Sequence, residues 1–297
     1  MIEPGLCAAR AAAAGEPLAG TASRFRHWLM IEQPGRWGHD ALLEGGLPGE
    51  IGAALEARGD DLGIRVLLIR RRDRPNSTPR RCFAAFTGRR ERRLAAFEID
   101  DPGELMDIDL ASLVERHWKG FGRSIPGPLF LVCTHGKRDP CCSRYGGPPA
   151  RALADRPDVW ESTHVGGDRF AGNLVCFPHG LYFGRVDALS AARVADAYAR
   201  GSVVLEHYRG RSSYPPAVQA AEQQVRSTRG LSGVDDLVLA DHVREGGGRH
   251  RVVFEEPEGK RHAVVVREGH LEPRLLTCKA EHPHAPRSFV VEPAAPG

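Results

Sequence analysis

Lysine, aromatic side chains and long hydrophobic runs are all scarce in this sequence of 297 residues. Lysine occurs four times, which leaves 37 arginines among the 41 basic residues, and aromatic residues make up 7%. No window approaches eighteen uncharged apolar residues, so we expect neither a membrane-spanning segment nor a membrane partner. The hydrophobic fraction of 41% and the charged fraction of 27% are typical of a soluble globular protein.

Several sequence motifs are also absent. The chain has no G-x-G-x-x-G after a strand, no P-loop, no G-x-S-x-G and no H-E-x-x-H. Independent nicotinamide binding, nucleotide hydrolysis and serine hydrolase chemistry are therefore not supported. The net charge of +3 gives no reason to expect a nucleic-acid partner. Few aromatics interleave with the eleven arginines between Arg65 and Arg93, so this segment favours a docking face for an acidic redox partner over nucleic-acid binding.

The N-terminus and the cysteine count indicate a reducing compartment. The alanine-rich segment from Met1 to Gly20 has no basic region before it and is interrupted by Arg10 and Glu16. It therefore does not read as a signal peptide, and we expect a cytoplasmic protein. An odd number of cysteines then favours metal ligands, catalytic thiols or buried residues over disulfides. The seven cysteines are Cys7, Cys82, Cys133, Cys141, Cys142, Cys176 and Cys278.

Hydrophobic periodicity predicts an α/β protein of three units. These are an N-terminal α/β domain over 1–125, a thioredoxin-like domain over 126–210, and a small α+β extension over 211–297. A stretch rich in glycine and proline at 121–128 predicts the first linker. In the first unit we expect strands at 27–31, 64–69, 82–86 and 93–99, and helices at 50–58 and 104–118. In the extension we expect a helix at 217–229 and strands at 252–255, 262–266 and 288–291.

The middle unit has the clearest pattern. A buried strand at 129–132 precedes a helix at 142–153, and a second strand at 159–163 follows it. A hairpin is expected at 173–177 and 181–186, and an alanine-rich helix at 190–200. This succession of strand, helix, strand, hairpin and helix is typical of the thioredoxin-like half fold.

Two loops of this unit carry the side chains with metal-binding chemistry. Cys133 ends the first strand, and Cys141 and Cys142 lie at the expected helix start, where the helix dipole lowers a thiol pKa. Thirty-one residues after Cys133, His164 and Asp168 flank a Gly-Gly turn that lets both side chains converge. Two pairs of ligands at strand ends in one small unit predict a metal centre.

The strings around these residues resemble the sucrase/ferredoxin-like family. The first runs from Cys133-Thr134-His135-Gly136 to Cys142, the second covers 159–173, and the third is Pro178-x-Gly180-x-Tyr182-x-Gly184-Arg185. Residues 16–22 and 31–38 also resemble the N-terminal part of that family, so that the likeness covers about Cys7 to Arg226.

The resemblance implies a thioredoxin-like ferredoxin module with a two-iron, two-sulfur cluster. Such a module passes single electrons between a reductase donor and an acceptor, neither of which the sequence identifies. In the family, two cysteines of the C-T-H-G loop and two histidines of an H-x-G-G-H motif hold the cluster. By position these ligands are Cys133, Cys142 and His164, and Asp168 stands where the family has its second histidine.

The sequence alone does not identify the fourth ligand of the cluster. Asp168 would add a hard anionic donor, which lowers the reduction potential. We then expect a value between the roughly −400 mV of plant-type clusters and the about −150 to +300 mV of histidine-ligated ones. Water, His135 and Cys141 are alternatives, although adjacent side chains at a helix start point in different directions, which disfavours Cys141. Lys137, Arg138 and Arg169 could offset the charge of the cluster.

Two other functional hypotheses are alternatives to the electron carrier. One is a thiol-based redox enzyme, although its usual C-x-x-C motif is absent. The other is a zinc-bound module, since cysteine, histidine and aspartate all bind zinc. Cys176 fits a core thiol, and Cys7, Cys82 and Cys278 receive no role. The sequence leaves the oligomeric state open, a homodimer included.

Overall fold

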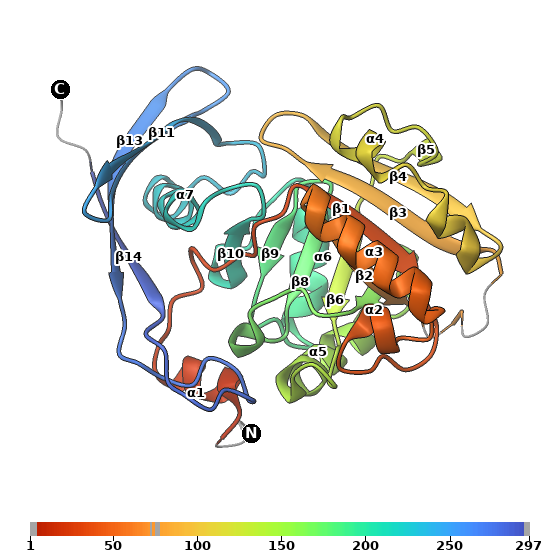
Figure 1. Cartoon of the computed structure of the whole chain (residues 1–297). Coiled ribbons are helices and arrows are strands. Elements are labelled where there is room, and N and C mark those ends of the chain that lie inside the picture. The colour runs from red at the N-terminus through yellow and green to blue at the C-terminus, as the bar shows by residue number, and fades with distance from the viewer. Residues whose placement is uncertain (1–4, 72, 75–77, 294–297) are drawn as a thin grey trace.

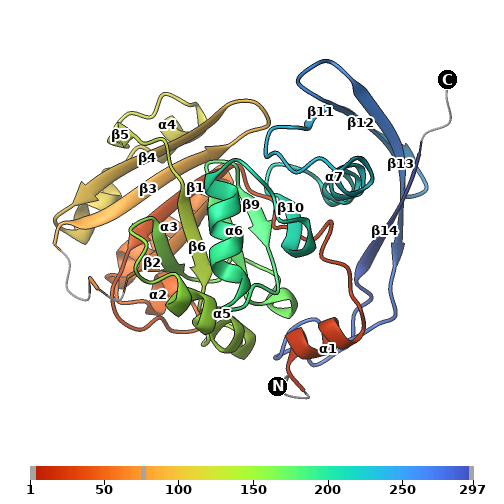
Figure 2. The same cartoon turned by 180° about the vertical axis from the view of Figure 1, so that it is seen from behind.

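The computed structural model describes residues 5–71, 73–74 and 78–293. The protein is a mixed α/β structure built on a ten-stranded sheet in the order β10-β9-β8-β6-β7-β2-β1-β3-β4-β5, with a separate four-stranded sheet in the order β11-β12-β13-β14 (Figure 1). The N-terminal helix α1 (Cys7–Ala13) lies apart from the large sheet, next to the C-terminal segment that connects β13 with β14 (Figures 1 and 2). Segments from both ends of the chain therefore meet.

The large sheet consists of two halves that follow each other in the sequence. The first half contains β1 (His27–Glu32), α2 (Ala41–Glu44), α3 (Gly49–Leu62), β2 (Ile64–Arg70), β3 (Arg80–Thr87), β4 (Arg92–Ile99), the 3-10 helix η1 (Pro102–Met106), α4 (Leu110–Val114) and β5 (Arg123–Ser124). The second half contains β6 (Leu129–Cys133), α5 (Pro140–Ala152), β7 (Val159–Ser162), η2 (Asp168–Phe170), β8 (Leu174–Phe177), β9 (Leu181–Phe183), α6 (Ser190–Ala199), η3 (Leu205–His207) and β10 (Tyr208–Arg211).

The two halves share one strand order. The first is β2-β1-β3-β4-β5 and the second is β7-β6-β8-β9-β10. In each half the first two strands in sequence pair in parallel, and all the remaining pairs within the half are antiparallel. The halves join where β2 pairs with β7, through Ile69 with Ser162 and Arg70 with Glu161. Because both pairs lie at the carboxyl ends of their strands, the loops that follow β2 and β7 start close to the junction.

Successive side chains along each strand point to opposite faces of the sheet, so that the sheet has a core layer on each face. Trp28 of β1 faces inward and contacts Phe177 of the other half, with ring centroids 5.1 Å apart. Leu29, its neighbour, faces outward and packs under α3. In the same way Leu131 of β6 faces inward and Phe130 faces outward, toward α6. Helices α3 and α6 therefore cover opposite sides of the molecule (Figures 1 and 2).

The C-terminal part of the chain packs a helix on the small sheet. It comprises α7 (Pro216–Arg229), β11 (Val238–Gly246), β12 (Arg249–Glu255), β13 (Arg261–His270) and β14 (Arg287–Pro293). Glu222 of α7 is fully buried between Arg211 and Arg226, at 2.9 and 3.1 Å. Burial alone would raise the pKa of Glu222, but the two guanidinium groups hold it below its usual value. This ionic network joins α7 to β10 of the large sheet.

Most predicted elements are confirmed, one prediction is wrong, and one long strand was not predicted. The helix expected at 104–118 is instead the 3-10 helix η1 followed by the short helix α4, because Asp101 and Asp109 each start a new capped turn. Strand β11 was not predicted, since most of its residues are exposed and polar. The predicted domain boundaries stay a prediction, although the large sheet continues across residue 125. No helix in the described part of the chain is long and apolar enough to span a bilayer.

Candidate metal centre

The two predicted ligand loops meet at one edge of the sheet. Strands β6 and β7 are parallel, so Cys133 at the end of β6 and the residues after β7 lie side by side. Asp139 caps α5 by accepting a hydrogen bond from the backbone N–H of Cys141 at 2.9 Å. This cap places Cys142 in the first turn of α5, with its thiol close to Cys133 and His164.

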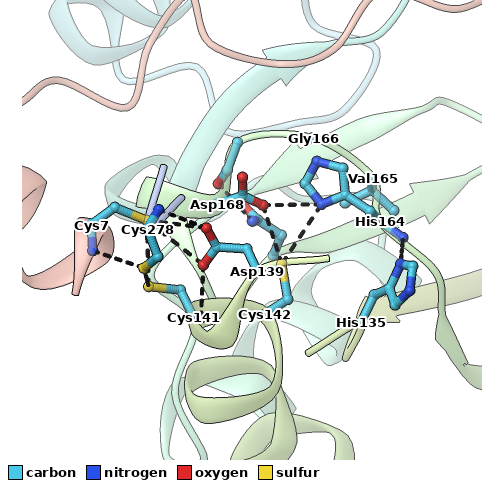
Figure 3. Close-up of polar contacts among 12 residues, drawn as sticks. Cys7, His135, Asp139, Cys141, Cys142, His164, Val165, Gly166, Asp168 and Cys278 are labelled. Carbon is cyan, nitrogen blue, oxygen red and sulfur yellow. Dashed lines mark hydrogen bonds and ion pairs between the residues drawn. The ribbon is translucent and has the colours of Figure 1, made fainter. Parts of the chain in front are cut away.

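Three of the four predicted ligands form a compact group. The Sγ atoms of Cys133 and Cys142 and a ring nitrogen of His164 all lie within 4.8 Å of one another. The fourth, Asp168, lies beside them: its Oδ1 is 3.0 Å from Nδ1 of His164 and 3.3 Å from Sγ of Cys142 (Figure 3). Sγ of Cys142 is 3.7 Å from the same Nδ1. Two thiols and an imidazole therefore face a common centre, and the carboxylate of Asp168 contacts two of these three groups.

The centre is buried on its sulfur side and open on its other side. Cys133 and Cys142 are 1% and 0% exposed, whereas the side chain of His164 is 19% exposed. A cavity of about 370 Å³ touches His164 and Asp168, and Arg138 and Arg169 also line it. The imidazole and the carboxylate thus face the route by which a partner or solvent can reach the group.

The thiols and the imidazole influence one another's ionisation. The hydrogen bond from Cys142 lowers the pKa of Cys133, and the same interaction together with burial raises the pKa of Cys142. Burial alone would lower the pKa of His164, but the neighbouring Cys133 raises it. Burial raises the pKa of Asp168, although His164 opposes this effect. In the absence of a cation, the arrangement therefore favours one thiolate, Cys133, next to a protonated imidazole.

The Gly-Gly turn of the second loop is held by residues to which the sequence assigned no role. Gly166 and Gly167 have φ angles of 97° and 81°, and a Cβ on Gly167 would lie 2.2 Å from Nη2 of Arg209. The guanidinium of Arg209 is fully buried and donates to the carbonyl of Gly166 at 3.1 Å and to Oδ1 of Asn173 at 2.7 Å. Asn173 donates in turn to the carbonyl of Gly167. No local motif marks Arg209, since it comes from β10, 41 residues beyond Asp168.

The alternative fourth ligands point elsewhere. Nε2 of His135 is 2.6 Å from the carbonyl oxygen of Gly38, and its Nδ1 accepts the backbone N–H of His164 at 3.3 Å. Both ring nitrogens are thereby occupied, and His135 positions the His164 loop. Sγ of Cys141 lies 3.4 Å from Sγ of Cys7, on the other side of Asp139 (Figure 3). Of the protein side chains considered for the fourth position, Asp168 is the one beside the group.

The basic residues near the centre are largely engaged within the protein. Arg169 pairs with Glu16 at 2.7 Å, and Arg65 donates to the carbonyl of His164 at 2.6 Å. Of the arginine-rich segment, Arg70 pairs with Glu161 at 2.9 Å and Arg92 pairs with Asp235 at 2.7 Å. Arg72 lies outside the described residues. The charge of this segment is therefore partly neutralised by internal acidic partners, which leaves less of it for a docking face.

Comparison with known proteins places the chain in a family. The sequence model described as sucrase/ferredoxin-like matches residues 18–210. Three curated relatives are named Altered inheritance of mitochondria protein 32. The protein from Debaryomyces hansenii is 33% identical over 97 residues, which cover 28% of this chain and 35% of the relative. The protein from Meyerozyma guilliermondii is 30% identical over 101 residues, which cover 30% and 36%.

The third relative, from Eremothecium gossypii, is 28% identical over 126 residues, which cover 33% of this chain and 40% of the relative. The matched part thus spans at most 40% of the length of these relatives. No solved structure matches the chain. The family match covers both candidate ligand loops and more than half of the sequence, so the chain belongs to the sucrase/ferredoxin-like family.

Proposed function

We propose that this protein is a one-electron carrier whose iron-sulfur cluster is held by Cys133, Cys142, His164 and Asp168. The observation that carries the proposal is the convergence of two thiols from the C-T-H-G loop on the imidazole and carboxylate of the H-x-G-G-D loop. A bound two-iron, two-sulfur cluster would supply reversible one-electron chemistry at a potential set by its ligands.

The donor set fits such a cluster chemically. Iron-sulfur clusters are held by thiolates, and imidazole can replace thiolate on one of the two irons. The favoured ionisation of Cys133 supplies a thiolate, and burial raises the pKa of Asp168, although the neighbouring His164 opposes this effect. The exposed side of His164 offers the shortest path to a redox partner. We also propose that the protein receives its electron from a reductase donor and passes it to an acceptor. In this proposal the two cysteines bind one iron, and His164 and Asp168 bind the other.

A single tetrahedral ion is the second candidate, because two of three separations between the donor atoms match the spacing of its ligands. Zinc bonds of about 2.0 to 2.3 Å place neighbouring ligand atoms about 3.3 to 3.8 Å apart. The separations here are 3.7 Å from Cys142 to His164, 3.3 Å from Cys142 to Asp168, and 3.0 Å from His164 to Asp168. A two-iron cluster has two metals and two sulfides between its ligands, so its binding requires the ligand pairs to move apart.

A thiol-based redox enzyme fits the geometry less well. Cys133 and Cys142 are buried, so neither sulfur is accessible to a bulky disulfide substrate. The adjacent Cys141 and Cys142 do not act as a pair, because their sulfurs contact different groups. This leaves metal binding as the chemistry that the site supports best.

The deciding experiment is anaerobic purification of the full chain, followed by a visible spectrum and by iron and acid-labile sulfide analysis. The cluster proposal expects a coloured protein with about two irons and two sulfides per chain, and loss of both in Cys133→Ala. The control is Cys82→Ala, which removes a buried thiol that lies outside both ligand loops. A colourless protein whose zinc content falls in Cys133→Ala would instead establish the second candidate, and a colourless protein whose metal content is the same in wild type and in Cys133→Ala would refute both.

A further inference from the structure

Three thiols from distant parts of the sequence meet on the far side of Asp139. They belong to Cys7 in α1, Cys141 in α5 and Cys278 in the segment between β13 and β14. Sγ of Cys141 lies 3.4 Å from the sulfur of Cys7 and 3.4 Å from the sulfur of Cys278 (Figure 3). The four donor atoms of this group, including a carboxylate oxygen of Asp139, all lie within 4.8 Å of one another.

This group is distinct from the first centre. Cys141 and Cys142 are adjacent in α5, but their sulfurs point into different groups, and Asp139 lies between the two (Figure 3). Cys7 and Cys278 both lie outside residues 18–210, the part that the family model matches. We will refer to Cys7, Asp139, Cys141 and Cys278 as the terminal cluster, because it joins segments near the two ends of the chain.

The hydrogen bonds around the terminal cluster suit sulfur in its anionic form. The backbone N–H of Cys7 donates to Sγ of Cys278 at 3.3 Å, and that of Ala8 donates to Sγ of Cys141 at 3.5 Å. The Asp139 carboxylate accepts from the backbone N–H groups of Cys141 and Cys278, at 2.9 and 2.8 Å. These amides fix the sulfur and oxygen donors around a common point without neutralising them.

The terminal cluster is buried, so its thiols and carboxylate can all be ionised together only if a cation is bound among them. Cys7, Asp139 and Cys141 are 1%, 1% and 0% exposed. Several acidic groups in one buried place repel one another when ionised, and a bound cation removes this repulsion. Three sulfurs and one carboxylate oxygen are a complete tetrahedral set for zinc, whose ligand sulfurs lie about 3.8 Å apart. Since no two donors are separated by more than 4.8 Å, the group has the size of a site for one ion.

We propose that the terminal cluster binds a single zinc-class divalent cation as a structural site. The ion would tie α1 and the segment around Cys278 to the first turn of α5. Asp139 also caps that turn, and the turn carries Cys142 of the first centre. The structural ion therefore stabilises the part of the chain that presents one of the ligands proposed for the cluster.

The test is zinc analysis of the full chain by mass spectrometry after dialysis against a weak chelator. We expect one zinc to remain in Cys133→Ala/Cys142→Ala, which removes two donors of the first centre and leaves the terminal cluster intact. We expect Cys7→Ala/Cys278→Ala to lose this zinc, and the control Cys82→Ala to keep it. Circular dichroism checks that each variant is folded.

Cobalt gives a second measurement that does not depend on the double variants. Cobalt(II) added to the metal-free wild-type chain, and to the single variant Cys278→Ala, reports thiolate ligation by its sulfur-to-metal absorption. The proposal expects this absorption to decrease in Cys278→Ala and to be unchanged in Cys82→Ala. Equal absorption in all three proteins would overturn it, as would a disulfide between two of the three thiols in protein purified under reducing conditions, detected by intact mass. A Cys133→Ala/Cys142→Ala protein that is folded but free of zinc would overturn it too.

Discussion

The two halves of the large sheet share a strand order but differ at the place where their first two strands end. In the first half, β1 ends at Glu32, whose carboxylate is fully buried and bonds Nε of Arg74 at 2.9 Å. Arg74 comes from the loop after β2. In the second half, β6 ends at Cys133, and its thiol faces His164 from the loop after β7. The equivalent meeting point of two loops thus holds an ion pair in one half and the proposed metal ligands in the other.

This difference shows that the fold determines where the two loops meet, whereas the sequence determines which side chains meet there. Two parallel strands bring the loops at their carboxyl ends together, whichever side chains those loops carry. Glu32 and Arg74 neutralise each other, so the first half needs nothing further. Cys133, Cys142, His164 and Asp168 hold more negative than positive charge when ionised, and our proposal is that a metal centre balances this charge in the second half. Function therefore depends on the loops and not on the sheet.

The largest expected effect comes from removing the key side chain of each half. Cys142→Ala should abolish iron binding, because it deletes a sulfur ligand from the group. Glu32→Gln should leave the iron content unchanged and lower the free energy of unfolding by about 1 to 3 kcal/mol, since Arg74 loses its buried anionic partner. Iron analysis and chemical denaturation measure the two effects. Loss of iron in a folded Glu32→Gln protein would show that the halves do not act independently.

A smaller effect is expected from alanine at one left-handed glycine in each half. Gly167→Ala strains a residue with φ of 81° and places a Cβ 2.2 Å from the buried guanidinium of Arg209. We expect a loss of about 1 to 3 kcal/mol in the free energy of unfolding and a reduced iron content, because the His164–Asp168 loop must shift. Gly63→Ala at the end of α3 is the matched control: its φ is 65° and no atom lies near the added Cβ.

Gly63→Ala should cost about 1 kcal/mol of stability through strain alone and leave the metal content intact. Thermal or chemical denaturation and iron analysis of both variants provide the comparison. If the two substitutions lowered the iron content equally, the turn at Gly166 and Gly167 would have no special role in presenting the ligands.

A third change alters the charge of the centre without removing a ligand position. Asp168→His replaces an anionic donor with a neutral one and should raise the reduction potential, from an intermediate value toward the about −150 to +300 mV of histidine-ligated clusters. Potentiometric titration measures the shift. Asp155→His makes the same change in charge at an exposed position after the C-terminal end of α5, and should leave the potential nearly unchanged. A potential in wild type already as high as in Asp168→His would argue against ligation by Asp168.

The sequence predicted several strands well because they are short, nearly continuous apolar runs. The runs at 27–31, 64–69 and 129–132 are apolar on both faces, and the curled sheet buries both faces. It did not predict the shared strand order, because the two halves have the same topology but show no repeat in their amino-acid sequences. Strand β11 could not be found from burial, as its exposed side chains carry no hydrophobic pattern.

The candidate site was predictable only where its residues lie in local motifs. Cys133, Cys142, His164 and Asp168 were found because each pair lies within ten residues of sequence. Arg209, which supports the Gly-Gly turn, and the pairing of Cys7 with Cys278 depend on contacts between distant segments. A single sequence carries no spacing signal for such contacts, and for that reason the isolated cysteines received no role.

The smallest expected effect concerns pH and lies in the half without the metal-ligating group. Burial lowers the pKa of His27, which stacks on Phe86 with ring centroids 5.1 Å apart. A lowered pKa in the folded state means that the unfolded chain binds the proton more readily, so stability should fall as pH decreases below about 6.5. His27→Phe keeps the stacking and should make this decrease smaller by a fraction of a kcal/mol in denaturation curves at pH 7 and pH 5. Burial also lowers the pKa of His135, His179 and His242, so these groups keep the rest of the decrease. His117→Gln, at a mostly exposed position, should keep the full decrease. If His27→Phe lost as much stability between pH 7 and pH 5 as the wild type, His27 would not contribute to the acid sensitivity. Another titrating group would then have to account for it.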